Sequence, residues 1–196
     1  MFIFAMAAVA LSWCLSSAPR AADNWAIELW RAQDYAAERE DPAEKHSFGA
    51  VRIAQTSVRP PYDGTHLAVL RANGSLAFDP YNGFAAAPAQ MLRGALQDAA
   101  EASGAFERVV ASNSSAKCDL SLEATVTRLA LDCRKEGRRD ASLGLTLILL
   151  KGRDVVATAE AESKVATGDG DYSAAFSRAF AKAALAAIEK LPPKND

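Results

Sequence analysis

The sequence predicts an α+β fold in which two amphipathic helices pack on one face of a mostly antiparallel sheet. Segments 87–103 and 172–191 repeat apolar residues at helical spacing. Much of the remaining chain alternates apolar and polar residues over short runs, which is typical of half-buried strands. The predicted order is three strands, a helix, a strand, three long antiparallel strands and a final helix. An α+β sandwich is the economical packing for that order.

The composition is that of an ordinary globular domain. Of the 196 residues, 50% are hydrophobic and 23% are charged, and the formal net charge is −2. This length suggests one domain, large enough to bury a core without disulfides or metals. No segment gathers the basic residues that nucleic-acid binding requires, so nucleic acid is not an expected partner.

Residues 1–22 are predicted to form a signal peptide. Residues 1–15 are apolar and small residues follow them, which is the pattern of a secretory signal. The apolar run is shorter than the roughly 20 residues that a membrane span needs. Two alternatives stay open: an uncleaved inner-membrane anchor, and a lipoprotein signal whose acylated residue is Cys14. Trp13 departs from the small residue that a lipoprotein signal carries before its cysteine.

Residues 23–46 are predicted to contain a strand, over 24–31, and a charged linker. Further strands are expected over 48–58 and 65–71, joined by a rigid turn that contains two prolines. The dipeptide Asn73-Gly74 predicts a hairpin between 65–71 and a short strand over 75–78.

The segment 79–86 is predicted to be a loop that carries Phe84. Pro88 suits the first turn of the helix that follows, and Gly104 suits its end. The apolar stripe of this helix consists of Met91, Leu92, Ala95, Leu96 and Ala99.

The second half of the chain predicts a short strand over 106–111 and a long strand over 118–133. Alternation in the long strand changes phase after Val126, which indicates a β-bulge near Thr127 or Arg128. Segments 141–150 and 154–165 predict a hairpin. Asp169 or Asp171 is expected to cap the last helix, and residues 192–196 form a tail.

Cys118 and Cys133 are expected to be free thiols. At ~3.3 Å per residue, one continuous strand between them separates their sulfurs far beyond disulfide reach. A turn near Thr127 would instead bring them together, and an oxidising compartment would permit the bond.

No catalytic or metal-binding motif was found. The sequence lacks a nucleophile elbow, a P-loop and a zinc-protease motif, and its two histidines, His46 and His66, are isolated. Asp132 and Asp140 flank a basic turn, and we interpret them as solvated charges. We therefore expect no enzymatic activity, no metal and no cofactor.

A dispersed pattern of turn, small and aromatic residues lies between 58 and 110. Its members are Tyr62, Asp63, Gly64, Arg71, Tyr81, Phe84, Ala87, Pro88, Ser103, Gly104 and Phe106. This pattern resembles the ABC-type transport auxiliary lipoprotein family (PqiC-like). The similarity runs over about residues 47–191, which we take as the domain.

The resemblance implies an envelope protein without chemistry of its own. Family members are lipoproteins, typically on the periplasmic face of the outer membrane, and some form rings. They accompany MCE-domain, ABC-driven systems that move lipids or other hydrophobic compounds. The implied partners are an MCE-domain protein and ABC transporter subunits, with homo-oligomers and membrane association through lipidated Cys14 as further expectations.

Tyr62, Tyr81 and Phe84 are the candidate partner contacts, because exposed aromatic side chains supply large contact areas at low entropic cost. In the competing interpretation, Phe84 fills the core beneath the first helix and the alanines at 85–87 let that helix approach the sheet. Two other functions stay open: a free-standing assembly factor of pilotin-like build, and direct lipid binding. Lipid binding requires a large apolar cavity, which alanine-rich helices disfavour.

Overall fold

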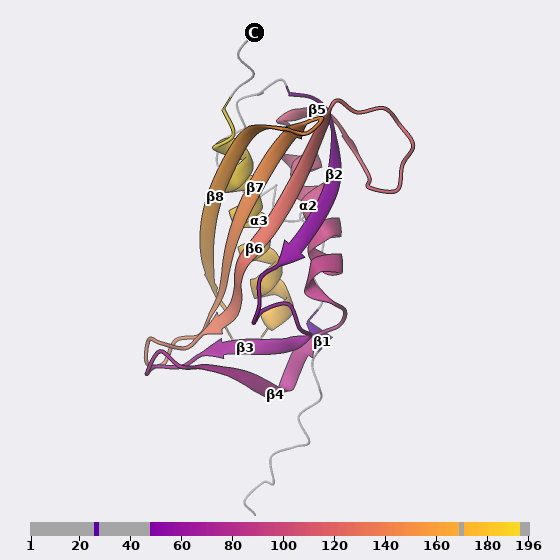
Figure 1. The fold of residues 1–196 in the computed structure, drawn as a ribbon. Helices are drawn as coiled ribbons and strands as arrows, with labels where there is room; N and C mark the ends of the chain where they lie inside the picture. The colour runs from indigo at the N-terminus through magenta and orange to yellow at the C-terminus, as the bar shows by residue number, and fades with distance from the viewer. Residues whose placement is uncertain (1–25, 28–47, 169–170, 193–196) are drawn as a thin grey trace, which may run out of the picture.

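The computed structural model describes residues 26–27, 48–168 and 171–192 (Figure 1). The predicted signal peptide, the linker and most of the predicted strand 24–31 lie outside these residues, as does most of the tail. No helix in the described part of the chain is long and apolar enough to cross a bilayer.

The described residues form a single α+β domain. Helix α3 packs on β7 and β8, whereas α2 packs on β2, β5 and α3, so both helices cover the same face of the sheet (Figure 1). The predicted fold class is therefore confirmed. The elements are β1 (Ala26–Ile27), β2 (Phe48–Val58), β3 (His66–Leu70), β4 (Leu76–Phe84), α2 (Pro88–Ser103), β5 (Phe106–Val110), β6 (Leu120–Asp132), β7 (Asp140–Lys151), β8 (Asp154–Ala166) and α3 (Tyr172–Glu189).

The sheet is mixed: its longest pairings are antiparallel, as predicted, and parallel pairs accompany them. Pairs β3–β4, β6–β7 and β7–β8 are antiparallel, whereas β2 runs parallel to β5 and β6, β3 runs parallel to β6, and β1 to β4. Parallel neighbours require crossover connections. Helix α2 provides one by returning the chain from β4 to β5.

The second crossover is the segment 111–119, which passes from β5 over β2 to β6. Arg52 on β2 fixes it, because its guanidinium donates hydrogen bonds to the carbonyl oxygens of Ala111, Ser114 and Ala116. The strands that become parallel neighbours, such as β2 and β6, lie far apart in the sequence, so local alternation of apolar residues does not reveal their pairing.

The core lies between the sheet and the two helices. Its largest buried side chains include Phe176 and Phe180 of α3 and Leu143, Leu145 and Leu147 of β7. Most other positions on the buried face of α3 are alanines, which let the helix lie close to the sheet: Ala175, Ala179, Ala183, Ala184 and Ala187.

The predicted bulge in β6 is confirmed at Thr127. Val126 pairs with Leu145 and Arg128 pairs with Gly144, so Thr127 is the additional residue. The insertion restores the phase of the strand, because a one-residue slip would otherwise turn every following side chain to the opposite face. Leu129 therefore points into the core, where it is 1% exposed.

The predicted end of α2 and the predicted cap of α3 are confirmed, whereas α3 ends at Glu189 rather than at 191. Gly104 ends α2 in the left-handed conformation, with φ of 66°. The carboxylate of Asp171 accepts a hydrogen bond from the N–H of Ala174 at 2.9 Å at the start of α3. Cys118 and Cys133 are free and flank β6, as the single-strand prediction required.

Strand β8 is a long edge strand, since the only described strand that pairs with it is β7. Two features interrupt this edge. Its register with β7 shifts between Leu149 and Leu150, and the Lys190 ammonium donates to the carbonyl oxygen of Glu160 at 2.7 Å. Such interruptions are common protections of exposed strand edges.

The backbone contact at Gly83 predicts a sensitivity to a single methyl group. A Cβ at position 83 would lie 2.7 Å from the carbonyl oxygen of Thr65, which accepts the N–H of Phe84. We expect Gly83→Ala to lower the free energy of unfolding in urea by about 1–3 kcal/mol, because the two backbones must separate.

Gly49→Ala is the matched control, because a Cβ there would have no atom within 4 Å. Its free energy of unfolding should change by less than about 0.5 kcal/mol. Equal effects of the two substitutions would contradict the close approach at Gly83.

Candidate partner-contact surface

Strand β4 presents an open edge to solvent. On one side it pairs with β3, and on the other β1 pairs only with Gly83 and Phe84, so no described residue pairs with the outer edge of 76–82. Two large side chains on this strand are mostly exposed, Phe78 at 51% and Tyr81 at 59%. Exposed apolar side chains beside an unpaired strand edge are typical of surfaces that bind another chain.

A large bulge positions Tyr81. Phe78 pairs with Ala68 and Gly83 with His66, so five steps along β4 match two along β3. Asp79 closes this bulge: its Oδ1 accepts from the N–H of Tyr81 at 2.8 Å and from that of Asn82 at 3.1 Å. Most of the loop predicted over 79–86 is therefore an irregular part of β4, which extends to Phe84, and its turn residues serve the bulge.

The three predicted contact residues differ in their surroundings. Tyr81 is exposed, and Tyr62 is half-buried against the core. Phe84 is only 6% exposed and its ring meets that of Phe176 edge-on, with centroids 5.6 Å apart. Because its side chain is buried in the described chain, Phe84 does not fit the contact hypothesis.

The competing interpretation of this segment is confirmed for Phe84 but not for the alanines that follow it. Phe84 belongs to the same core cluster as Leu92 and Leu96 of α2, and its ring also meets Phe176 of α3. Ala85 and Ala87 are exposed. The close packing of α2 comes instead from alanines within the helix, such as Ala99.

Leu76 and Phe78 were missed by the sequence analysis. They alternate with polar or small residues, and that pattern ordinarily indicates the buried face of a strand. Here β4 lies at the edge of the sheet, so both side chains are exposed, and His66 lies edge-on to Phe78 with ring centroids 6.5 Å apart. Whether such an alternating strand is buried or exposed depends on its place in the sheet order, which local sequence does not specify.

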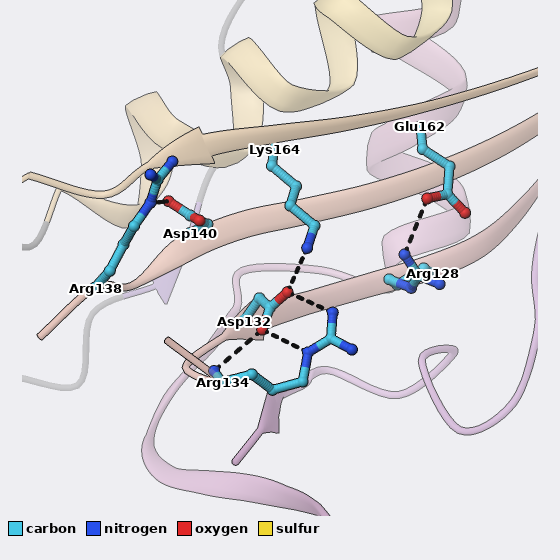
Figure 2. A network of polar contacts seen from close by, with 7 residues as sticks. All are labelled: Arg128, Asp132, Arg134, Arg138, Asp140, Glu162 and Lys164. Carbon is cyan, nitrogen blue, oxygen red and sulfur yellow. Dashed lines mark hydrogen bonds and ion pairs between the residues drawn. The ribbon is translucent and has the colours of Figure 1, made fainter. Parts of the chain in front are cut away.

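Two ion pairs bridge from β6 to β8 across β7 on the face of the sheet opposite the helices (Figure 2). Lys164 Nζ lies 2.7 Å from Asp132 Oδ2, and Arg128 Nη1 lies 3.2 Å from Glu162 Oε2. Gly144 stands in register between Arg128 and Glu162. The missing side chain at this position leaves room for the arginine to cross the middle strand.

Asp132 and Asp140 are buried, at 6% and 5% exposure, so their interpretation as solvated charges was wrong. They pair directly across β6 and β7, where like charges repel. A guanidinium two residues away neutralises each: Arg134 Nη2 lies 2.7 Å from Asp132 Oδ2, and Arg138 Nε lies 2.8 Å from Asp140 Oδ1. Figure 2 shows both arginines turned back onto the carboxylates.

This polar network has the chemistry of a structural site. The hydrogen bonds from Arg134 hold the pKa of Asp132 well below its usual range, with Lys164 acting in the same direction. Such a carboxylate is a poor proton carrier at neutral pH. Burial raises the pKa of the neighbouring Cys133 thiol, which keeps it protonated and weakly nucleophilic. The described residues contain no group of three side chains placed to hold a metal.

The model of the family described as ABC-type transport auxiliary lipoprotein component matches residues 33–187. The chain belongs to this family. Membership of this lipoprotein family indicates a location in the cell envelope. The ABC-type transport auxiliary lipoprotein components are in general non-catalytic. No curated protein sequence matches it.

Solved structures similar to this auxiliary component include a Xanthomonas campestris protein of the DUF330 family. That protein is 24% identical, with a TM-score of 0.58, covering 76% of this chain and 85% of the other. An uncharacterised protein is 15% identical, with a TM-score of 0.55 and coverages of 72% and 93%. A PelC dodecamer from Paraburkholderia phytofirmans, 15% identical, has a TM-score of 0.42 and coverages of 76% and 95%. The first two support the fold.

The buried carboxylate of this auxiliary component predicts a pH-dependent stability. Because folding lowers the pKa of Asp132, its contribution is complete above the unfolded value of about 4 and is lost as the pH falls below it. We expect Asp132→Asn to lower the free energy of unfolding in urea by about 2 kcal/mol at neutral pH. The difference from the unsubstituted chain should shrink in acid.

Glu162→Gln is the control for this experiment, because its ion pair with Arg128 is exposed. It should change the free energy of unfolding by less than about 1 kcal/mol at neutral pH. Suppose instead that Asp132→Asn and the unsubstituted chain differ in free energy of unfolding by the same amount at neutral and at acid pH. That result would contradict the ionised, paired state of Asp132.

Proposed function

We propose that this auxiliary component is a non-enzymatic docking subunit of an envelope system that transports lipids or other hydrophobic compounds. Family membership supports a role in ABC-type transport. In the proposal, the protein lies in the periplasm, is anchored to the outer membrane through lipidated Cys14, and binds an MCE-domain protein or ABC transporter subunits.

The exposure of Tyr81 is the main observation that supports a docking role. Its side chain is 59% exposed, on a strand with an open edge, and Asp79 fixes its backbone N–H. An exposed aromatic side chain on a fixed backbone is a common energetic centre of protein interfaces. The open backbone edge of β4 supplies additional hydrogen-bonding groups to an approaching chain.

Tyr62 is a secondary candidate contact. Its N–H donates to the carbonyl oxygen of Arg59 at 2.9 Å, and its ring packs partly against the core, so its position is fixed before any partner binds. Preorganisation of this kind reduces the entropic cost of association. Phe84 has no part in the proposed contact.

Affinity purification of the tagged protein from cross-linked envelopes tests the proposal. We expect an MCE-domain protein or its ABC partners to be recovered and identified by mass spectrometry. Tyr81→Ala should weaken that association by about tenfold, because truncation of a central aromatic contact costs more than 1 kcal/mol.

Val155→Ala is the matched control, since Val155 is also exposed, at 63%, but lies on β8. It should leave recovery of the transport proteins unchanged. Recovery of neither an MCE-domain protein nor ABC subunits would favour the free-standing assembly factor. Loss of self-association alone in Tyr81→Ala, with transport partners still recovered, would assign β4 to contacts between copies of this chain.

A further inference from the structure

We propose that one end of the molecule lies against an anionic bilayer surface. This end, which we call the basic tip, consists of the β3–β4 turn (71–75) and the β6–β7 turn (133–139). The inference goes beyond the proposed function, which concerns docking to proteins, and it rests on two parts of that proposal, the envelope location and the lipid anchor on Cys14. The ligand is the phosphate-bearing surface of a lipid bilayer.

The two turns are joined in the fold. Leu70, the last residue of β3, pairs with Asp132, the last residue of β6, and the N–H of Cys133 donates to the carbonyl oxygen of Leu70 at 2.8 Å. Figure 1 shows both turns at the same end of the molecule, with the β7–β8 turn at the opposite end. Residues distant in sequence therefore form one surface.

The basic tip is positively charged although the whole chain has a net charge of −2. Its two turns contain a single acidic residue, Glu136, and five basic ones: Arg71, Arg134, Lys135, Arg138 and Arg139. All five basic side chains are exposed. A cluster of exposed basic groups is the charge pattern that anionic lipid surfaces attract.

Two of these five basic residues neutralise buried carboxylates: Arg134 pairs with Asp132, and Arg138 pairs with Asp140. The other three, Arg71, Lys135 and Arg139, make no ion pair with a described carboxylate. Their charges are therefore available to an external anion. At the surface of a bilayer, each such cation contributes about 1 kcal/mol of attraction.

Apolar side chains adjoin this charge. Leu76 and Phe78 follow directly after the β3–β4 turn and are 36% and 51% exposed. Leu76 lies in the same cross-strand row as Leu70 and Asp132, which places it beside the β6–β7 turn. Aromatic and aliphatic side chains next to basic ones are the combination that partitions into the interface between headgroups and acyl chains.

The position of β1 favours a bilayer over a soluble partner as the occupant. Ala26 pairs with Gly83, at the end of the β3–β4 hairpin away from its turn, and Figure 1 shows β1 at the same end of the molecule as this hairpin. Cys14 is twelve residues before Ala26, and a stretch of that length spans at most about 40 Å. A lipid on Cys14 would tether this end of the molecule, rather than the opposite end, near the membrane.

Vesicle co-sedimentation of the full chain tests the inference. We compare partitioning into vesicles that contain phosphatidylglycerol with partitioning into vesicles of phosphatidylcholine alone. The apolar segment 1–15 is present in every variant and carries no side-chain charge, so the ratio between the two vesicle types isolates the effect of the protein's charges. We expect the unsubstituted chain to prefer the anionic vesicles, and added salt to reduce that preference.

The double substitution Arg71→Gln, Lys135→Gln should lower the anionic preference by about fivefold for each charge removed. Phe78→Ser should weaken binding to both vesicle types. Because these side chains are exposed, urea unfolding should show that both variants remain folded.

The matched control is Lys151→Gln, Arg153→Gln, which removes the same charge at the β7–β8 turn, beside the exposed Val155 and Val156. It should leave most of the anionic preference intact. An equal loss in the control, or equal binding of the unsubstituted chain to both vesicle types, would overturn the proposal.

A third result would also overturn it. If the Arg71→Gln, Lys135→Gln variant bound vesicles normally but lost its transport partners in the cross-linking experiment, the basic tip would be a protein-binding surface. The vesicle assay contains no transport protein. Its failure is therefore distinct from failure of the docking function proposed for Tyr81.

Discussion

Strand β6 hydrogen-bonds to three other described strands, and the rest of the structure depends on this shared pairing. One edge follows β7 along its whole length, while the other is divided between β2 at its start and β3 at its end. The bulge at Thr127 keeps apolar residues on the core side throughout this length. Because β3 pairs only with the last residues of β6, the β3–β4 hairpin is placed at the end of the molecule, beside the β6–β7 turn.

The same arrangement explains why charge accumulates at that end. Small side chains on β7, at Ser142 and Gly144, allow Lys164 and Arg128 to reach across the middle strand. Asp132 and Asp140 would repel each other without their arginines, so the basic turn is required by the buried acids. The β6–β7 turn therefore stabilises the sheet and also exposes cations at this end of the molecule. In this way the packing of β6 is connected to the proposed membrane contact.

Much of the fold could be predicted from local pattern. Helical spacing, the Asn-Gly turn, the phase change at Thr127 and the cap at Asp171 each depend on residues near in sequence, and the structure confirms them. The parallel pairs could not be predicted, because they join strands that lie far apart in the sequence, such as β2 and β6. For the same reason, the burial of Phe84 against Phe176 and the exposure of Phe78 depend on the order of strands rather than on alternation. Among the candidate contacts, only Tyr81 is both predicted from sequence and mostly exposed.

The interrupted edge of β8 has a consequence for proteins crowded at a membrane. The outer edge of this thirteen-residue strand, with which no described strand pairs, would ordinarily offer a template on which the sheets of successive copies could join end to end. A strand approaching this one would have to displace the Lys190 ammonium from the carbonyl oxygen of Glu160 and to match a backbone already out of register near Val156. The chain can thus be concentrated on a surface while its longest free edge resists open-ended, fibre-like growth.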